Sequence, residues 1–476
     1  MLVLLVIFAA IEFTLPLATT VQTGSDEGFE LAKATLCLHG HHLYSEVWND
    51  QPPLHTFLVT EVLKHVSTSI LAPRLLTVLF AAILLASVFL IIQRLHGTTP
   101  AIIATGLLLA SPGFVELSNS CMLEIPSLAT AVAALVILLL PKPGRWHLWT
   151  AASGLVFGLA LQTKLVPAIL LSLVVLILWL KHCEGTLPPK KLLVPLMVFG
   201  VSMMAAYILS DLLIERGAYL AHFSQSWHSH FAAAKTDEYG GAKYYPFDVS
   251  VLLKNWDTTV PALAGVILLL RTWRTNLWRL VPLAWLVVTF VVFTIHRPWW
   301  AYYYVHTAIP LCWCAAIAFA SAVGWAVRNR KRAALVALAG FSLCAVCWMG
   351  GRMYVQAEAI RNSPQLYAEP VLGYIARLHP YAHYMYASKE IYSFHAGIPM
   401  PPELAVVPLK RFWAGEITND RIAAELASVR PEIILLNNDG QQAPFQALLD
   451  RDYRLVFEDR EHRLYAYTSI ARQIIE

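Results

Sequence analysis

Charged residues are scarce in this sequence. Only 14% of its 476 residues are Asp, Glu, Lys or Arg, whereas 57% are hydrophobic. Soluble domains carry about 25% charged residues, so this composition excludes an ordinary soluble protein. The net charge of +4 is small, and it gives no reason to expect a nucleic-acid partner.

The sequence also lacks several short motifs. Residues 1–20 are apolar but have neither the basic segment nor the small-residue cleavage site of a removed signal peptide. We therefore expect them to remain as a first membrane helix. The seven cysteines are scattered and match no closed zinc motif. Cys37 and Cys121 would both face an oxidising compartment, but their spacing does not decide whether they form a disulfide.

Long apolar runs dominate what is present. Runs of about 17–25 apolar residues are long enough to cross a bilayer, and a few of those found here are shorter. The sequence therefore predicts a polytopic α-helical membrane protein with about eleven transmembrane helices. The runs are 1–20, 74–93, 100–115, 123–141, 148–163, 165–181, 192–214, 257–270, 280–296, 303–326 and 333–350.

Basic residues lie in alternate connections between these runs. Under the positive-inside rule such connections are cytoplasmic. The amino terminus is then expected inside, and the first loop (21–73), the loop at 215–256 and the tail after residue 350 outside. The basic residues are Arg94, Lys142, Arg145, Lys181, Lys190, Lys191, Arg271, Arg274, Arg279, Arg328, Arg330, Lys331 and Arg332.

The last part of the chain changes character. Short β-rich runs alternate with helical ones there. We expect two domains, a transmembrane catalytic module over residues 1–350 and a small extracytoplasmic α/β domain over residues 351–476. The expected strands are 383–388, 403–407, 432–437, 453–459 and 463–469, and the expected helices are 417–429 and 441–450.

The first outer loop is rich in polar residues. Asp26 and Glu27 come directly after the first apolar run, and a helix that begins near Asp26 would place Asp26, Glu30 and Lys33 on one polar face. A second helix is expected after the tandem prolines at 52 and 53. Both helices are expected to lie along the bilayer surface.

The order of these motifs resembles that of the GT-C class of polyprenyl-phosphate-dependent glycosyltransferases. The bacterial branch with the lipid A aminoarabinose transferase, the protein O-mannosyltransferases and the lipopolysaccharide-core sugar transferases is most similar. The shared features are the acidic pair, GHHLY (40–44), NDQPPL (49–54), the acid of CMLEIPS, GLVFGLALQTK (154–164) and HRPWWAYYYVH (296–306). The resemblance implies a multi-pass protein of the bacterial plasma (inner) membrane. It would transfer a hexosyl or pentosyl group from a polyprenyl-phosphate-linked sugar to an acceptor outside.

The resemblance also implies roles for individual residues. The first acid of the loop contacts the acceptor in the family, which corresponds to Asp26 here. We assign Asp26 as general base of an inverting transfer, with Glu27 in support. Glu124 would bind the sugar or the acceptor, although it could instead be a solvated loop acid.

Cations and aromatic residues are expected at the donor. Lys164 fits the donor phosphate by charge neutralisation, although it could instead extend to the membrane interface. Arg297, preceded by His296, is a second candidate for the phosphate. Tyr303 and His306 could line the donor site or belong to an interfacial aromatic belt.

The NDQPPL segment departs from the pattern of the aminoarabinose transferases. An acid and a lysine precede the two prolines in that family, whereas Asp50 is followed by Gln51 here. Both residues remain candidates for substrate binding. The cation that would contact the phosphate is missing at this position, which shifts the prediction toward Lys164 and Arg297.

No metal or other cofactor is expected. The alternative is a divalent ion held by Asp26 or Asp50 together with one histidine from each outer loop. The other expected partners are membrane lipids and an acceptor of unknown type. An alternative function is that of a transporter or lipid flippase without transferase activity. Such a protein should place ionisable residues near the midpoints of its helices and often has inverted repeats, whereas here these residues cluster at outer helix ends.

Overall fold

The structure is a computed structural model that describes residues 1–19, 26–140, 144–187, 192–232, 245–329, 332–362, 369–440 and 443–475. The chain divides into two compact units. Unit 1 comprises Met1–Leu17, Arg74–Ser210 and Tyr245–Ser363. Unit 2 comprises Ala18–Pro73, Asp211–Tyr244 and Pro364–Glu476.

Every apolar run predicted from the sequence contains an α-helix. Because lipid offers no hydrogen-bond partner to the backbone, an apolar run satisfies its N–H and C=O groups by forming a helix. These helices are α1 (Leu2–Phe13), α4 (Leu71–His96), α5 (Thr98–Leu109), α7 (Glu124–Leu139), α8 (Trp146–Thr163), α9 (Leu171–Cys183), α10 (Leu193–Glu215), α14 (Trp256–Thr272), α15 (Leu280–Ile295), α16 (Tyr304–Asn329) and α17 (Arg332–Arg361).

Not all of these helices are long enough to cross a bilayer alone. Among the described residues, six segments have the length and composition of a membrane span, and three shorter apolar helices accompany them. The fold is therefore that of a polytopic helical membrane protein, as predicted. The six segments are Leu71–His96, Val166–Cys183, Leu193–Glu215, Leu277–Ile295, Ala301–Arg328 and Leu335–Arg361.

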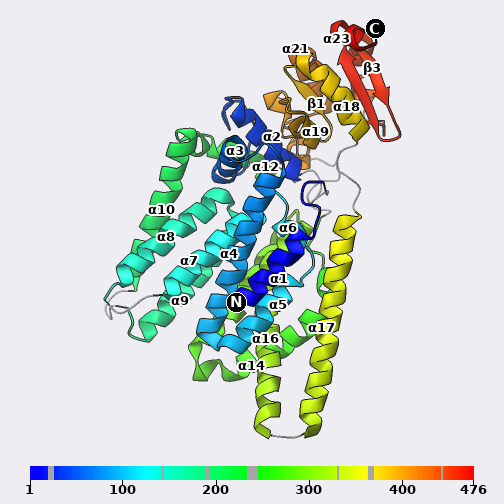
Figure 1. Cartoon of the computed structure of the whole chain (residues 1–476). Coiled ribbons are helices and arrows are strands. Elements are labelled where there is room, and N and C mark those ends of the chain that lie inside the picture. The colour runs from blue at the N-terminus through cyan, green and yellow to red at the C-terminus, as the bar shows by residue number, and fades with distance from the viewer. Residues whose placement is uncertain are drawn as a thin grey trace. The chain divides into compact units, whose positions relative to one another are not determined.

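Glycines set how closely some helices of unit 1 approach one another. Helix α7 packs along α8, and α16 packs against α5 and α14 (Figure 1). Helix α16 also packs against α15. A Cβ at Gly154 or Gly158 of α8 would collide with backbone carbonyls of α10. A Cβ at Gly265 of α14 would collide with the Cys314 carbonyl of α16. Small residues four apart are the usual means of close helix contact in membranes.

Unit 2 contains a four-stranded sheet in the order β1-β2-β4-β3. Strands β1 (Met385–Ala387) and β2 (Ile433–Asn437) are parallel, whereas β4 (His462–Tyr467) is antiparallel to both β2 and β3 (Tyr453–Glu458). The helices of this carboxy-terminal part are α18 (Glu369–Leu378), α19 (Ile391–Ala396), α20 (Leu409–Trp413), α21 (Asn419–Val429), α22 (Gln446–Asp452) and α23 (Thr468–Ile475). The small α/β domain predicted from the sequence is therefore present.

One predicted strand was wrong. Residues 403–407 form no strand, and a 3-10 turn at Pro402–Leu404 takes its place. The prolines at 401 and 402 lack the N–H group that a sheet ladder requires. Leu404 and Val406 are nevertheless buried, so the apolar pattern reports burial rather than a strand.

The first loop folds as part of unit 2. Helix α2 (Asp26–Leu38) begins at Asp26, and α3 (Leu54–His65) follows the two prolines, as predicted. Phe29 and Leu36 of α2 share one hydrophobic core with Tyr386 and Tyr465 of the sheet. The unit is thus built from segments that are distant in sequence, and the first loop and the carboxy-terminal part form one core. Unit 2 also contains α11 (Ala218–Ala221) and α12 (Phe223–Ala232).

The predicted domain boundary at residue 350 lies inside α17 (Arg332–Arg361), and the two compact units meet in sequence at Ser363 and Pro364. The functional division into a catalytic module over residues 1–350 and an outer domain over residues 351–476 stays a prediction.

Candidate functional site

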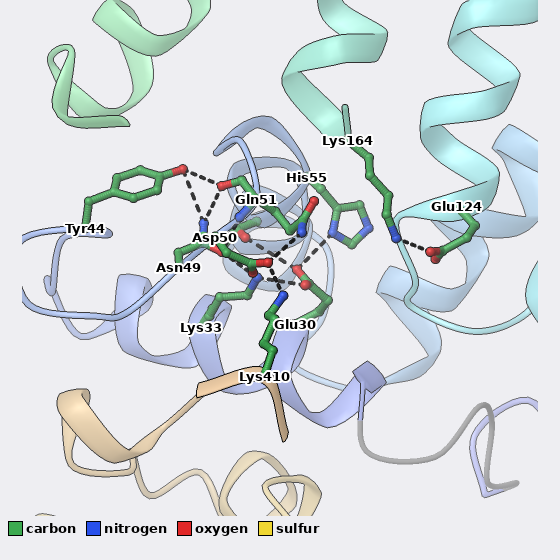
Figure 2. Close-up of polar contacts among 11 residues, drawn as sticks. Glu30, Lys33, Tyr44, Asn49, Asp50, Gln51, His55, Glu124, Lys164 and Lys410 are labelled. Atoms are coloured by element: carbon green, nitrogen blue, oxygen red, sulfur yellow. Dashed lines mark hydrogen bonds and ion pairs between the residues drawn. The ribbon is translucent and has the colours of Figure 1, made fainter. Parts of the chain in front are cut away.

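In unit 1, two predicted substrate-binding residues form a buried ion pair. Glu124 begins α7, and Lys164 follows the last residue of α8. The Lys164 ammonium donates a hydrogen bond to Glu124 Oε1 (Figure 2). The Glu124 side chain is completely buried, and Lys164 is 7% exposed. Neither the solvated-acid reading of Glu124 nor interfacial extension of Lys164 agrees with this burial.

Burial makes this pair costly to maintain without good partners. Removing two charges from water is expensive, and only close pairing and further hydrogen bonds offset that cost. Glu124 Oε2 is buried and has no hydrogen-bond partner among the described residues. This oxygen is the group of the pair that is most suited to accept a hydrogen bond from a bound ligand.

Aromatic rings surround the ammonium of this pair. The Lys164 ammonium lies 5.3 Å from the ring centroid of Tyr302 and 5.4 Å from that of Tyr303, which is within the range of a cation–π contact. Tyr303 stacks on Phe293 with ring centroids 5.4 Å apart. The predicted donor-site residues Lys164 and Tyr303 are therefore in contact.

Two histidines extend this aromatic group. The rings of His296 and Tyr303 lie 5.8 Å apart, and the rings of His306 and Phe293 lie 5.5 Å apart. Both ring nitrogens of His306 are buried without a hydrogen-bond partner among the described residues. Arg297, in contrast, is exposed and makes no hydrogen bond or ion pair to a described residue. Its contact with a phosphate stays a prediction.

In unit 2, the acidic pair begins α2. Asp26 is half-buried, and Glu27 is 1% exposed. Helix α19 packs against α2, and the Glu390 residue that precedes α19 reaches the α2 backbone. A Cβ at Gly28 would lie 3.3 Å from Glu390 Oε2. Burial raises the pKa of Glu390 to about 8, and the charge of Asp26 adds to the rise.

The polar face of α2 is buried rather than exposed to water. The Lys33 ammonium donates to Glu30 Oε1 at 2.7 Å and to Asn49 Oδ1 at 3.1 Å, and His55 Nδ1 lies 3.3 Å from Glu30 Oε2 (Figure 2). Burial alone would raise the pKa of Glu30, but Lys33 and His55 lower it to about 2. Glu30 is therefore a carboxylate held by two partners.

The NDQ segment continues this network toward the carboxy-terminal part. Asp50 is 5% exposed. Its Oδ2 atom accepts a hydrogen bond from the Gln51 amide at 2.9 Å and another from the Lys410 ammonium of α20. The two predicted substrate-binding residues Asp50 and Gln51 are thus joined to a cation that is distant in the sequence.

Tyr44 fixes the backbone of the same segment. Its hydroxyl donates to the Gln51 carbonyl at 2.7 Å, and Asn49 donates to that carbonyl at 2.9 Å. Tyr44 has a φ of 68°, a left-handed conformation that bulky residues rarely adopt. Such strain persists only where the surroundings impose it, and it is frequent at functional sites.

The candidate site residues fall into two groups, one in each unit. Glu124, Lys164, His296, Tyr303 and His306 gather in unit 1. Asp26, Glu27, Asp50 and Gln51 belong to unit 2. That all of them act on one substrate stays a prediction.

Sequence reasoning did not identify Lys410, Glu390 or Tyr302 as members of the site. Glu30 and Lys33 were expected on the polar face of α2. The sequence did not predict that this face is buried and that the two side chains form an ion pair there. Within the described residues, no group of three or more His, Cys, Asp or Glu side chains could hold a metal ion. Cys37 is a free, half-buried thiol.

Part of the chain matches a known protein family. Residues 50–209 match the family described as dolichyl-phosphate-mannose-protein mannosyltransferase. No curated protein sequence matches the chain. The matched residues include Asp50, Gln51, Glu124 and Lys164.

Solved structures match nearly the whole chain. ArnT from Cupriavidus metallidurans bound to undecaprenyl phosphate is similar with a TM-score of 0.67 at 15% identity, and the match covers 98% of both chains. The oligosaccharyltransferase AglB from Archaeoglobus fulgidus, in complex with an inhibitory peptide and a dolichol-phosphate, is similar with a TM-score of 0.57 at 12% identity. That match covers 94% of this chain and 70% of AglB. The resemblance expected from the sequence is therefore supported: the chain shares the fold of these solved structures, and residues 50–209 match the model of the mannosyltransferase family.

Proposed function

We propose that this protein is a membrane glycosyltransferase that moves a sugar from a polyprenyl-phosphate donor to an acceptor on the extracytoplasmic side. The observation that carries the proposal is the buried Glu124–Lys164 pair against aromatic rings in a chain with this fold. Similar structures hold undecaprenyl phosphate or dolichol-phosphate, which supports a lipid-phosphate donor. The sugar is a hexosyl or pentosyl group.

The proposed reaction is a single displacement. The acceptor hydroxyl oxygen attacks the anomeric carbon as the bond from that carbon to the phosphate oxygen breaks. The electron pair of the broken bond leaves with the polyprenyl phosphate, and the sugar carbon is inverted. Asp26 takes the proton of the acceptor hydroxyl. The products are the glycosylated acceptor and the free polyprenyl phosphate.

Each group of residues has a proposed part in this reaction. Lys164 neutralises the charge that develops on the departing phosphate. Glu124 holds Lys164 in place through Oε1 and offers Oε2 to a sugar hydroxyl. Tyr303 and His306 form an apolar wall that excludes water from the donor, which strengthens the electrostatic contacts. Glu27 supports Asp26.

The proposed location is the bacterial plasma membrane, with a cytoplasmic amino terminus and an extracytoplasmic unit 2. Basic residues in alternate connections support this orientation. It would place Asp26 on the side from which an acceptor outside the cell can approach.

The test is a transfer assay with purified protein in liposomes that contain a polyprenyl-phosphate-linked sugar. The Asp26→Asn variant should reduce turnover by ~10²-fold or more, because it removes the proton acceptor. Asp420→Asn is the matched control, since Asp420 is an exposed acid in the first turn of another helix of unit 2. Unchanged transfer by Asp26→Asn would remove Asp26 as base.

The same assay separates the alternative function. A lipid flippase would move the labelled lipid across the bilayer and transfer no sugar to any acceptor supplied. That outcome would overturn the proposed glycosyltransferase activity.

A further inference from the structure

The Asp50 Oδ2 atom accepts hydrogen bonds from two side chains. The Gln51 side-chain amide donates to this atom at 2.9 Å, and the Lys410 ammonium donates to the same atom (Figure 2). The Lys410 ammonium therefore lies beside the end of the Gln51 side chain. Gln51 carries no positive charge, and Lys410 of α20 supplies one at the same place.

Lys410 differs from the other lysine of the network in its availability. Lys33 is 2% exposed and donates to both Glu30 and Asn49. The Lys410 side chain is 22% exposed. An ammonium has three donor hydrogens, and among the described residues Lys410 gives a hydrogen bond only to Asp50. Lys410 can therefore bind an anion without leaving Asp50.

The surroundings hold Lys410 and add positive charge. The Lys410 ammonium lies 5.5 Å from the ring centroid of Trp48, and the Arg411 guanidinium lies 5.0 Å from the same ring. Arg411 is buried and donates to the carbonyls of Glu403 at 3.1 Å and Val406 at 2.7 Å. These contacts fix α20, so the ammonium is positioned before any ligand arrives.

We propose that Lys410 is a phosphate ligand of the lipid donor, contributed by the carboxy-terminal part of unit 2 to the first-loop site at Asp50 and Gln51. The recognised group is the phosphate of a polyprenyl lipid. This inference rests on the proposed function, because it assigns a residue to the donor of that reaction.

The proposal gives Asp50 and Gln51 different tasks. Asp50 positions the Lys410 ammonium through its carboxylate and would repel the phosphate if it were alone. Gln51 donates an amide hydrogen to the same carboxylate, and its second amide hydrogen can reach a phosphate oxygen.

The experiment measures equilibrium binding of undecaprenyl phosphate to the full-length protein in lipid nanodiscs. Lys410→Gln should weaken this binding ~10-fold to 100-fold, the usual effect of losing a charge-assisted hydrogen bond. Binding of the neutral alcohol undecaprenol should not change. Lys64→Gln is the matched control, since Lys64 is an exposed lysine of α3 in the same unit.

A rescue variant separates ligand binding from a structural role. Gln51→Lys combined with Lys410→Gln places an ammonium beside Asp50 from the other side. It should restore most of the binding of undecaprenyl phosphate. Thermal unfolding of each variant is followed in parallel, and the rescue variant keeps the test valid if Lys410→Gln alone unfolds.

Four results would overturn the proposal. They are unchanged binding of undecaprenyl phosphate by Lys410→Gln, an equal loss of undecaprenol binding, failure of the rescue, and, in a parallel measurement with inorganic phosphate, a loss confined to that ion. The last of these would assign the site to free phosphate instead of a lipid. The assay needs no sugar transfer, so it fails independently of the proposed function. Absence of transfer with binding that depends on Lys410 would count against the transferase activity alone.

Discussion

Buried charged side chains have different kinds of partners in the two units. In unit 1, Glu124 and Lys164 form a single ion pair among aromatic rings. In unit 2, charged and amide groups form a continuous chain from Glu30 through Lys33 and Asn49 to the NDQ segment and Lys410. The Glu124 carboxylate takes its hydrogen bond from Lys164, whereas charged groups of the chain such as Glu30 and Lys33 each have two partners.

This difference indicates where each unit tolerates change. A buried ion pair is strongly destabilised when its cation is removed, because the carboxylate charge is then left uncompensated. A network distributes that loss over several hydrogen bonds. The pair has the proposed role of holding a transient charge at the donor, whereas the network holds a backbone segment in place.

Breaking the pair should have the largest effect. Lys164→Met leaves the completely buried Glu124 carboxylate without its cation, so stability should fall by about 3–5 kcal/mol. Donor turnover should fall at the same time, because the phosphate loses its cation. Denaturant unfolding in detergent micelles and the transfer assay measure the two effects.

A double variant is the control for this prediction. Glu124→Gln together with Lys164→Met removes both charges and should recover much of the stability but none of the turnover. Recovery of both would show that the pair is only structural. A single Lys164→Met variant with wild-type stability would contradict the burial argument itself.

Breaking the network should have a smaller effect. Asn49→Ala removes the hydrogen bonds of the Asn49 side chain with Lys33, Tyr44 and the Gln51 backbone, but Lys33 keeps Glu30 and the Gln51 carbonyl keeps Tyr44. The expected loss of stability is about 1–3 kcal/mol. A loss as large as that of Lys164→Met would mean that the network is no more tolerant than the pair.

Taken per pH unit, the smallest effect on stability concerns the buried carboxyl of Glu390. Its pKa is raised from 4.5 to about 8 by burial, so between these values the folded protein holds a proton that the unfolded chain has released. Stability should therefore fall as the pH rises through this window, by up to about 1.4 kcal/mol per pH unit. Above pH 8 the effect should level off. Thermal unfolding against pH measures it.

Two glutamine variants sharpen this prediction. Glu390→Gln should remove the downward slope. Glu30→Gln should instead remove a pH dependence below pH 4.5. The pKa of Glu30 is lowered in the folded protein, so the wild-type protein loses stability as the pH falls from 4.5 toward 2. The same slope above pH 4.5 in wild type and Glu390→Gln would assign it to another group.

Much of unit 1 could be predicted from the sequence. An apolar run in a membrane has few alternatives to a helix, so every run became one. The contact of Lys164 with Tyr303 was expected only in outline, since both were assigned to the donor. That Glu124 is the partner of Lys164 could not be read from the spacing, because two helix ends 40 residues apart meet only through packing.

Unit 2 was less predictable for a related reason. The helix beginning at Asp26 follows from local sequence, and so do four of the five expected strands. The segment at 403–407 shows that buried apolar residues after prolines need not pair as a strand. Lys410 carries no local signal, because nothing near it in the sequence distinguishes it from a surface lysine.

The contact between Asp50 and Lys410 also sets an order of events during synthesis. The two residues are 360 positions apart, and a ribosome that adds about 5–20 residues per second needs roughly 20–70 s to reach the second after the first. The apolar helices of unit 1 that follow Asp50, from α4 to α17, are made within that interval. The Lys410 ammonium is therefore not available to Asp50 until the last quarter of the chain has been synthesised. If Lys410 holds the donor phosphate, the nascent protein cannot engage its lipid before the carboxy-terminal part has joined the first loop.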